Sequence, residues 1–220
     1  MIVRNNKYSE ELIFEDNEVG ALIASTSKFE PADKYPGVSK VLNATNDMSF
    51  LAAWKARVGE EEAERIINES IQIGKSFDML MFEYFKGSDV ESMVDEVAYK
   101  LYTQSKKHLK HIQPIALQLK VFSDKLKMQG YIDMLCYYKG ELTLLDFKNS
   151  AKYKHDDHLE SYYKQCTFYC MMLYDMYGIT VKQLVLFIGM RKHVYPDIRI
   201  SKAKYFVKDC VEANKNYYCT

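Results

Sequence analysis

The stretch covering residues 128–148 most constrains how this chain can fold. Two segments within it, residues 128–138 and 141–147, are rich in the aromatic and β-branched residues that strands favour. Lys139-Gly140 separates them, and a two-residue loop with glycine in second place is typical of a tight hairpin turn. The sequence therefore predicts an antiparallel β-hairpin here.

The turn also fixes which residues face each other across the hairpin. If Tyr138 pairs with Glu141, counting back along both strands places Asp133 directly opposite Asp146. Because side chains alternate along a strand, Lys148 shares the face of Asp146. The predicted hairpin therefore brings together two carboxylates and a lysine.

Two facing carboxylates repel each other and destabilise an antiparallel pair. A divalent cation would offset this repulsion, and magnesium or manganese prefers hard oxygen ligands of this kind. A lysine beside the metal can orient or deprotonate a water, while the cation stabilises charge on a phosphate oxygen. The pattern is therefore typical of metal-assisted hydrolysis of a phosphodiester. The alternative is a strand pair whose Asp and Lys side chains simply face solvent.

Several motifs resemble those of one nuclease superfamily. Gly130-Tyr-Ile-Asp133 followed by Leu144-Leu-Asp146-Phe-Lys148 resembles the core of the PD-(D/E)XK nucleases, and Gln165-Cys-Thr-Phe-Tyr169 resembles the Gln-x-x-x-Tyr signature of its RecB-like exonucleases. Segments that resemble mitochondrial genome maintenance exonucleases and phage exonucleases are Tyr35-Pro-Gly-Val-Ser-Lys-Val-Leu42, Leu51-Ala-Ala-Trp54 and Gly74-Lys-Ser-Phe-Asp78. The resemblance covers residues 35–188.

The resemblance implies an α/β fold with a restriction-endonuclease-like core, in which helices flank a mixed central sheet. It also implies a metal-dependent DNA exonuclease that prefers single-stranded ends and uses magnesium or manganese. We expect residues 35–220 to form the nuclease domain and residues 1–34 to form an amino-terminal arm of unassigned structure. The alternative is a nucleic-acid-binding protein that keeps the nuclease fold but cleaves weakly or not at all.

The resemblance assigns roles to individual residues as well. Asp133, Asp146 and the carbonyl of Phe147 would hold the metal, and Lys148 would orient the attacking water. Asp78 lies where related exonucleases often carry a histidine ligand, and its hard oxygen donors favour magnesium. An exposed helix carboxylate is the alternative for Asp78.

Gln165 and Tyr169 are four residues apart, so they project from one face of a helix expected over residues 157–177. In the resembled family this face lies against the active strand. Gln165 would there position the catalytic lysine or a phosphate, and Tyr169 would meet DNA. An ordinary amphipathic helix is the alternative for both. Lys75 and Lys152 are further candidates for contact with nucleic acid.

One position departs from the resembled family. Many relatives carry a glutamate on the strand that we expect over residues 115–122, and Gln118 stands in its place. Glutamine offers a carbonyl oxygen but no charge. This difference weakens the case for a second metal and favours the non-cleaving alternative.

Helical and strand periodicity predicts the remaining elements. Apolar residues at helical spacing indicate a long helix over residues 60–84. Gly74 lies inside it at a cost of about 1 kcal/mol relative to alanine, which indicates close backbone packing or a break. Further helices are expected over residues 38–44, 49–58, 89–109 and 203–217, and further strands over residues 182–190 and 194–200.

Composition limits the partners and the compartment. The chain is formally neutral, with 30 basic and 30 acidic residues, but residues 100–130 hold seven lysines and one acidic residue, Asp124. This basic segment favours contact with a phosphate backbone, although a solvated lysine-rich face explains it almost as well. Five cysteines without a Cys-x-x-Cys pair indicate the cytoplasm or another reducing compartment, the host cytoplasm if a phage encodes the protein. No apolar run is long enough to span a bilayer.

Overall fold

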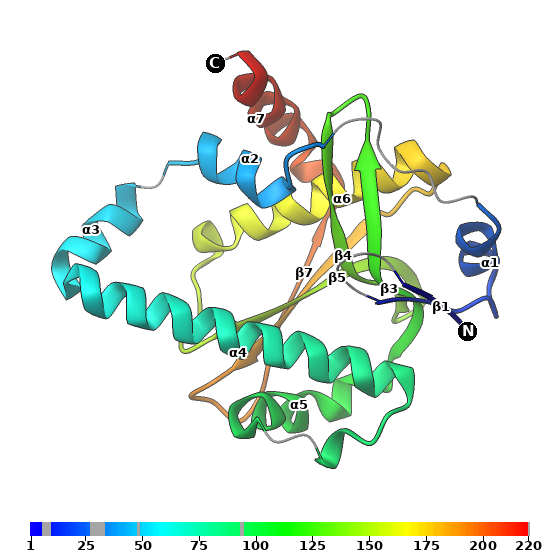
Figure 1. Ribbon diagram of the computed structural model, residues 1–220, viewed down its shortest axis with the longest axis horizontal. Coiled ribbons are helices and arrows are strands. Elements are labelled where there is room, and N and C mark those ends of the chain that lie inside the picture. Colours follow the sequence, from blue (N-terminus) through cyan, green and yellow to red (C-terminus); the bar gives the residue numbers. More distant parts are fainter. Residues whose placement is uncertain (6–9, 27–33, 48, 93–94, 220) are drawn as a thin grey trace.

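A computed structural model describes residues 1–5, 10–26, 34–47, 49–92 and 95–219 (Figure 1). Its strands form one sheet in sequence order, with every neighbouring pair antiparallel except β5 and β6, which are parallel. The strands are β1 (Ile2–Asn5), β2 (Glu10–Ile13), β3 (Ile112–Ser123), β4 (Met128–Tyr138), β5 (Glu141–Ser150), β6 (Gln183–Met190) and β7 (Asp197–Lys202). The predicted mixed sheet is therefore confirmed.

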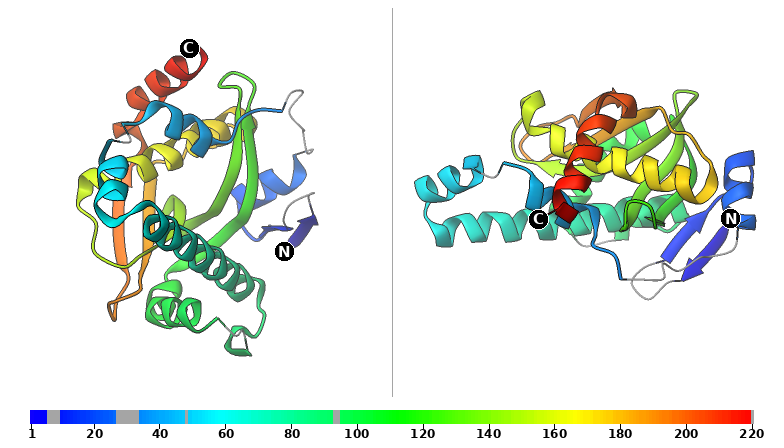
Figure 2. Two further views of the ribbon diagram at one scale, coloured as in Figure 1. Left: turned by 60° about the vertical axis from the view of Figure 1, so that its left-hand side comes forward. Right: turned by 90° about the horizontal axis from the view of Figure 1, so that it is seen from above.

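Helices cover both faces of this sheet (Figures 1 and 2). On one face lie α4 (Glu60–Lys86) and α5 (Glu96–Leu109), and on the other lie α2 (Val38–Thr45), α6 (Glu160–Tyr177) and α7 (Val207–Cys219). α1 (Glu18–Ser25) packs beside β2 and β3, and α3 (Ser49–Val58) leads into α4. Short 3-10 turns are η1 (Val90–Ser92), η2 (Asp156–His158) and η3 (Ala203–Tyr205). In the described part, no helix is both long and apolar enough to cross a membrane.

Each face of the sheet has its own hydrophobic core. Under α4 and α5, the rings of Phe77, Phe147 and Phe187 meet edge to face at centroid distances of 5.9 and 5.8 Å. Under α6, Leu144 and Leu186 are fully buried. Burying one such side chain stabilises the fold by about 1.5–3 kcal/mol. The two cores therefore hold the central strands between the helical layers.

The turn between β4 and β5 has the predicted primed geometry. Lys139 and Gly140 have φ angles of 53° and 84°, and two successive positive φ values define a type I′ turn. Tyr138 pairs with Glu141, so the predicted register of the hairpin is confirmed. Lysine is an unusual residue for the first turn position, where asparagine or glycine tolerates positive φ more readily.

The long helix α4 runs through Gly74 without a break. A Cβ atom at Gly74 would lie 3.2 Å from the side-chain nitrogen of Asn149 on β5, so the glycine allows close packing between helix and strand. Of the two alternatives predicted for Gly74, close backbone packing is therefore confirmed and a break in the helix is not. α6 ends at Gly178, whose left-handed backbone makes it the expected C-cap.

Several predicted elements begin at other residues than expected: β3 starts three residues earlier, and α6 and α7 start after the 3-10 turns η2 and η3. The helix predicted over residues 89–109 is replaced by η1 and then α5, because the Asp95 carboxylate accepts a hydrogen bond from the Ala98 N–H and starts a new helix. Residues 93–94 lie outside the described part. The last strand begins at Asp197, three residues later than predicted, directly after Pro196, which has no N–H to donate.

The described part of residues 1–34 adds to the sheet. β2 pairs with β3 through Leu12 opposite Leu117 and Ile13 opposite Ala116. Leu12 and Ile13 are fully buried, one in each hydrophobic core. These residues therefore belong to the same packed structure as the central strands.

Candidate active site

The sheet divides at Asp133. β4 pairs with β5 only from Tyr138 as far as Met134 opposite Leu145, whereas it pairs with β3 along its whole length. Figure 1 shows β3 and β4 as a long ribbon that extends beyond the rest of the sheet. Asp133 and Asp146 occupy the position next to this last pair, where β4 and β5 separate. We call this place the fork.

The backbone of β3 changes direction opposite Asp133. Gln118 has φ 51°, a left-handed conformation that is uncommon for residues other than glycine. Leu117 and Leu119, on either side of it, consequently enter opposite hydrophobic cores. Such backbone strain costs of order 1–3 kcal/mol and is concentrated at functional sites. The position that departs from the resembled family is thus part of the fork itself.

The predicted carboxylates and lysine lie together at the fork. Asp146 is buried, and its Oδ2 lies 2.5 Å from Lys148 Nζ. Asp133 Oδ2 accepts a hydrogen bond of 3.0 Å from the Phe147 N–H, a backbone group just beyond the last paired residue of β5. Lys148 Nζ also donates to the Phe147 carbonyl at 3.3 Å. One short segment of β5 therefore contacts every group that the hairpin motif predicted.

A third carboxylate comes from α4. Asp78 and Asp133 line a cavity of about 530 Å³ between α4 and the fork, and Lys75 and Gln118 line it too. Asp78 projects from the same helix that packs against β5 through Gly74. The structure thus places both of the predicted α4 residues beside the carboxylate of β4.

Acidic groups are crowded together at the fork. Burial and the nearby Asp146 raise the pKa of Asp133 to about 7. Burial and the nearby Asp133 raise the pKa of Asp78 to about 8. Burial by itself would lower the pKa of Lys148, but Asp146 and Asp133 together raise it above its ordinary value. Protonated Lys148 therefore lies among three carboxyl groups.

α6 packs against β4 beside the fork. Gln165 Nε2 donates a hydrogen bond of 2.9 Å to the Tyr169 hydroxyl. Tyr169 is only 6% exposed, and its ring lies where a Cβ on Gly130 would fall, 2.5 Å from that position. Tyr169 therefore contacts strand β4, and its burial fits a supporting role better than direct contact with DNA.

Sequence reasoning missed Tyr162. Its ring lies 5.5 Å from Lys148 Nζ, and Lys154 Nζ approaches the same ring at 4.8 Å and donates to the Tyr162 hydroxyl at 2.8 Å. A ring face near a lysine favours the charged ammonium group. Tyr162 precedes Gln165 by three residues, so helical spacing from the recognised motif was the signal that indicated its position.

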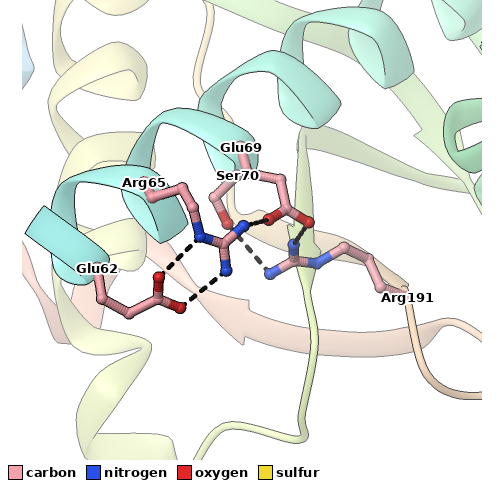
Figure 3. Close-up of polar contacts among 5 residues, drawn as sticks. All are labelled: Glu62, Arg65, Glu69, Ser70 and Arg191. Atoms are coloured by element: carbon pink, nitrogen blue, oxygen red, sulfur yellow. Dashed lines mark hydrogen bonds and ion pairs between the residues drawn. The ribbon is translucent and has the colours of Figure 1, made fainter. Parts of the chain in front are cut away.

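Polar contacts hold α4 against the end of the central strands. Asn149 Nδ2 donates to the Ser70 carbonyl at 3.1 Å. The guanidinium of Arg191 donates to Ser70 Oγ at 3.2 Å and lies 3.6 Å from the Glu69 carboxylate (Figure 3). Ser70 lies about two helical turns before Asp78. These contacts therefore fix the part of α4 that carries the third carboxylate.

The oxygen donors at the fork suit a cation such as magnesium. Asp146 Oδ2 is buried and, among the described residues, has no hydrogen-bond partner besides its ion pair with Lys148. Within the same residues, no three His, Cys, Asp or Glu side chains are grouped as a metal site. Magnesium needs only one or two carboxylates, with waters and substrate completing its shell. Asp133, Asp146 and the Phe147 carbonyl meet that requirement.

The mixed sheet, with an Asp on one strand and Asp-x-Lys on its neighbour, defines a nuclease-like α/β protein. The chain belongs to the PD-(D/E)XK nuclease superfamily, whose family model matches residues 30–208. A search of curated proteins gives no match to the chain. The superfamily and the fold predicted from the motifs are confirmed. Membership indicates nuclease activity on a nucleic acid, and a divalent metal is typical of this superfamily.

Proposed function

We propose that this protein is a metal-dependent DNA exonuclease that prefers single-stranded ends. One observation carries the proposal: Asp133, Asp146 and Lys148 converge where β4 separates from β5. The substrate and the exonuclease mode rest on the resemblance to RecB-like, mitochondrial genome maintenance and phage exonucleases. The fold and the superfamily are consistent with both.

In the proposed mechanism, Asp133, Asp146 and the Phe147 carbonyl hold the metal, and Asp78 adds a further carboxylate. Magnesium or manganese would stabilise charge on a phosphate oxygen and lower the pKa of a bound water. Lys148 remains protonated between carboxylates, so it orients the attacking water and attracts the phosphate.

The remaining candidate residues would position or contact the nucleic-acid substrate. The Tyr169 ring packs against Gly130 of β4 and its hydroxyl accepts a hydrogen bond from Gln165, an arrangement in which Gln165 would position Lys148 or a phosphate. Lys75 lines the cavity at the fork, and the exposed Lys152 follows β5, where both would contact the phosphate backbone. All five cysteines are free thiols, which supports a reducing compartment.

End-labelled single-stranded DNA tests the proposal. The wild type should release labelled product with magnesium or manganese, and a chelator should stop the reaction. Lys148→Ala should lower the rate by about 10²–10⁴-fold, because the group that orients the water is lost. Lys208→Ala, an exposed position on α7 outside the lysine-rich segment, is the matched control and should keep wild-type activity. Equal rates in Lys148→Ala and wild type would contradict the mechanism.

Circular substrates and RNA substrates test the exonuclease mode and the preference for DNA. A circular single strand has no end, so an exonuclease leaves it intact while it degrades the linear form. Cleavage of the circle would show an endonuclease instead. Parallel reactions on RNA of the same sequence decide whether the substrate is DNA.

A second candidate function is nucleic-acid binding without efficient cleavage. Gln118 favours it, because this residue lines the cavity at the fork where relatives often place a glutamate. The expected result is a gel-shifted complex with single-stranded DNA and no product. In that case Gln118→Glu should increase cleavage, whereas rapid cleavage by the wild type excludes this alternative.

A further inference from the structure

A second cavity, of about 1150 Å³, lies between the second half of α6 and the end of β7. It shares no lining residue with the cavity at the fork. Its floor comes from one face of α6, where Thr167, Cys170 and Met171 recur at helical spacing, and from Val181 in the link to β6. Pockets that hold ligands or peptide side chains have a similar or smaller volume and a mainly apolar lining.

Large apolar side chains surround this cavity and face solvent. Tyr174 from α6, Ile200 from β7 and Tyr205 from η3 line it and are 57%, 51% and 61% exposed. Exposed apolar groups gathered around a cavity mark an interaction site, whereas scattered ones do not. This rim therefore suits a partner that contributes apolar side chains of its own.

Three lysines stand on one side of the same cavity. Lys182, Lys202 and Lys204 all line it, and the Ala203 N–H donates to the Lys182 carbonyl at 3.3 Å, which joins their two segments. In the described part of the chain, none of the three is within ion-pair distance of an acidic group. The partner that complements this rim is anionic.

β7 also offers a backbone edge. It is the last strand in the order of the sheet, and it pairs with β6 on one side. The outer edge of a strand can pair with an extended peptide, whose alternate side chains then enter neighbouring pockets. Ile200, Ser201 and Lys202 at this edge are also lining residues of the cavity.

We propose that this cavity is a docking site for an extended acidic peptide from a protein partner. The peptide backbone runs beside β7, an apolar side chain enters the cavity over Cys170 and Met171, and flanking carboxylates pair with Lys182, Lys202 and Lys204. This site would attach the nuclease to its partner without occupying the fork.

Acidic side chains interrupt the basic lining of the cavity, which disfavours nucleic acid as the occupant. Glu141 and Asp175 also line the cavity, and Asp175 already pairs with Lys125 at 3.2 Å. A single strand of nucleic acid needs a continuous basic track along its phosphates. A compact group of lysines beside an apolar cavity instead matches a short peptide.

Fluorescence anisotropy with the full chain tests the proposal. The probe is a short labelled peptide of alternating glutamate and phenylalanine, and labelled oligothymidylate in a chelator is the second probe. Lys202→Glu/Lys204→Glu should weaken peptide binding by about tenfold or more, because two attractive pairs become repulsive. Lys107→Glu/Lys110→Glu, two exposed positions on and after α5 with the same change in charge, should bind the peptide as the wild type does.

A separate variant tests whether an apolar side chain of the peptide enters the cavity. Tyr174→Ala removes an exposed wall of the cavity and should weaken binding of the glutamate–phenylalanine peptide. A matching glutamate–alanine peptide should bind poorly to the wild type and equally poorly to Tyr174→Ala. Absence of peptide binding, or equal loss in both lysine variants, would overturn the proposal. So would oligothymidylate binding that only Lys202→Glu/Lys204→Glu removes, because that result makes the surface a nucleic-acid site.

Discussion

The carboxyl group of Asp78 binds a proton more tightly in the folded protein than in the unfolded chain. Its pKa rises from 3.8 to about 8, and the pKa of Asp133 rises from 3.8 to about 7. Between these limits the folded state binds more protons than the unfolded state, so the free energy of unfolding falls as pH rises. Without metal, the fork is therefore least stable in alkaline solution.

Asp78→Asn removes one of these charges. Without metal it should raise the melting temperature at about pH 8.5, where the wild-type carboxylate is forced to ionise, and change it little at about pH 5. Magnesium should stabilise the wild type more at the higher pH, since the cation replaces protons, and should stabilise Asp78→Asn less. Differential scanning fluorimetry with a magnesium titration measures both effects.

Glu61→Gln, an exposed position on the same helix, is the matched control for this prediction. It should leave both the pH dependence and the magnesium response unchanged. An equal gain from magnesium in Asp78→Asn and wild type would remove Asp78 from the proposed metal site.

At the scale of elements, α4 is held in place by contacts whose burial differs. Arg191 has a side chain only 16% exposed and contacts Ser70 and Glu69, whereas Arg65 is 62% exposed and contacts Glu69 and Glu62 (Figure 3). Water screens the exposed arginine, so its ion pairs contribute little. The half-buried Arg191 therefore contributes more than Arg65 to holding α4 against the strands.

Replacing each arginine by methionine separates the two contributions. Arg191→Met should lower the free energy of unfolding by about 1.5–3 kcal/mol, because hydrogen bonds to charged groups are lost in a shielded place. Arg65→Met should cost only about 0.2–1 kcal/mol. Urea unfolding of both variants measures the difference, and equal losses would contradict the role given to Arg191. A parallel fall in nuclease rate for Arg191→Met alone would link this contact to the position of Asp78.

At the scale of the whole molecule, the amino-terminal strands continue the central sheet. Leu12 of β2 is fully buried in the core under α4 and α5, and Ile13 is fully buried in the opposite core. β2 therefore contributes to both cores. The division into an arm of residues 1–34 and a domain of residues 35–220 stays a prediction, and unfolding experiments test it.

Leu12→Ala should lower the free energy of unfolding by about 2–5 kcal/mol, because it leaves a cavity beneath the sheet. Val3→Ala, on the neighbouring strand and 45% exposed, should change it by less than about 0.5 kcal/mol. Chemical unfolding with one cooperative transition for both variants would show a single folding unit. A loss at Leu12 as small as that at Val3 would instead indicate a loosely attached arm.

The hairpin was predictable because its information is local. The strand composition and the glycine at the turn lie within residues 128–148, so Tyr138 pairs with Glu141 as the sequence predicted. The long helix α4 was predictable for the same reason, since apolar residues repeat along it. The start of α5 was mispredicted because a single cap residue, Asp95, outweighs the periodicity around it.

The sequence by itself therefore determined the hairpin, its register and the superfamily, since each of the motifs involved consists of residues close together in the chain. Only the tertiary structure decided that β4 leaves β5 at Asp133, that Tyr169 is buried, and that Tyr162 lies beside the lysine. Those features depend on how α4, β3 and α6 pack around the strands. Packing brings together residues that are far apart in sequence. A local sequence pattern does not determine which side chains become buried.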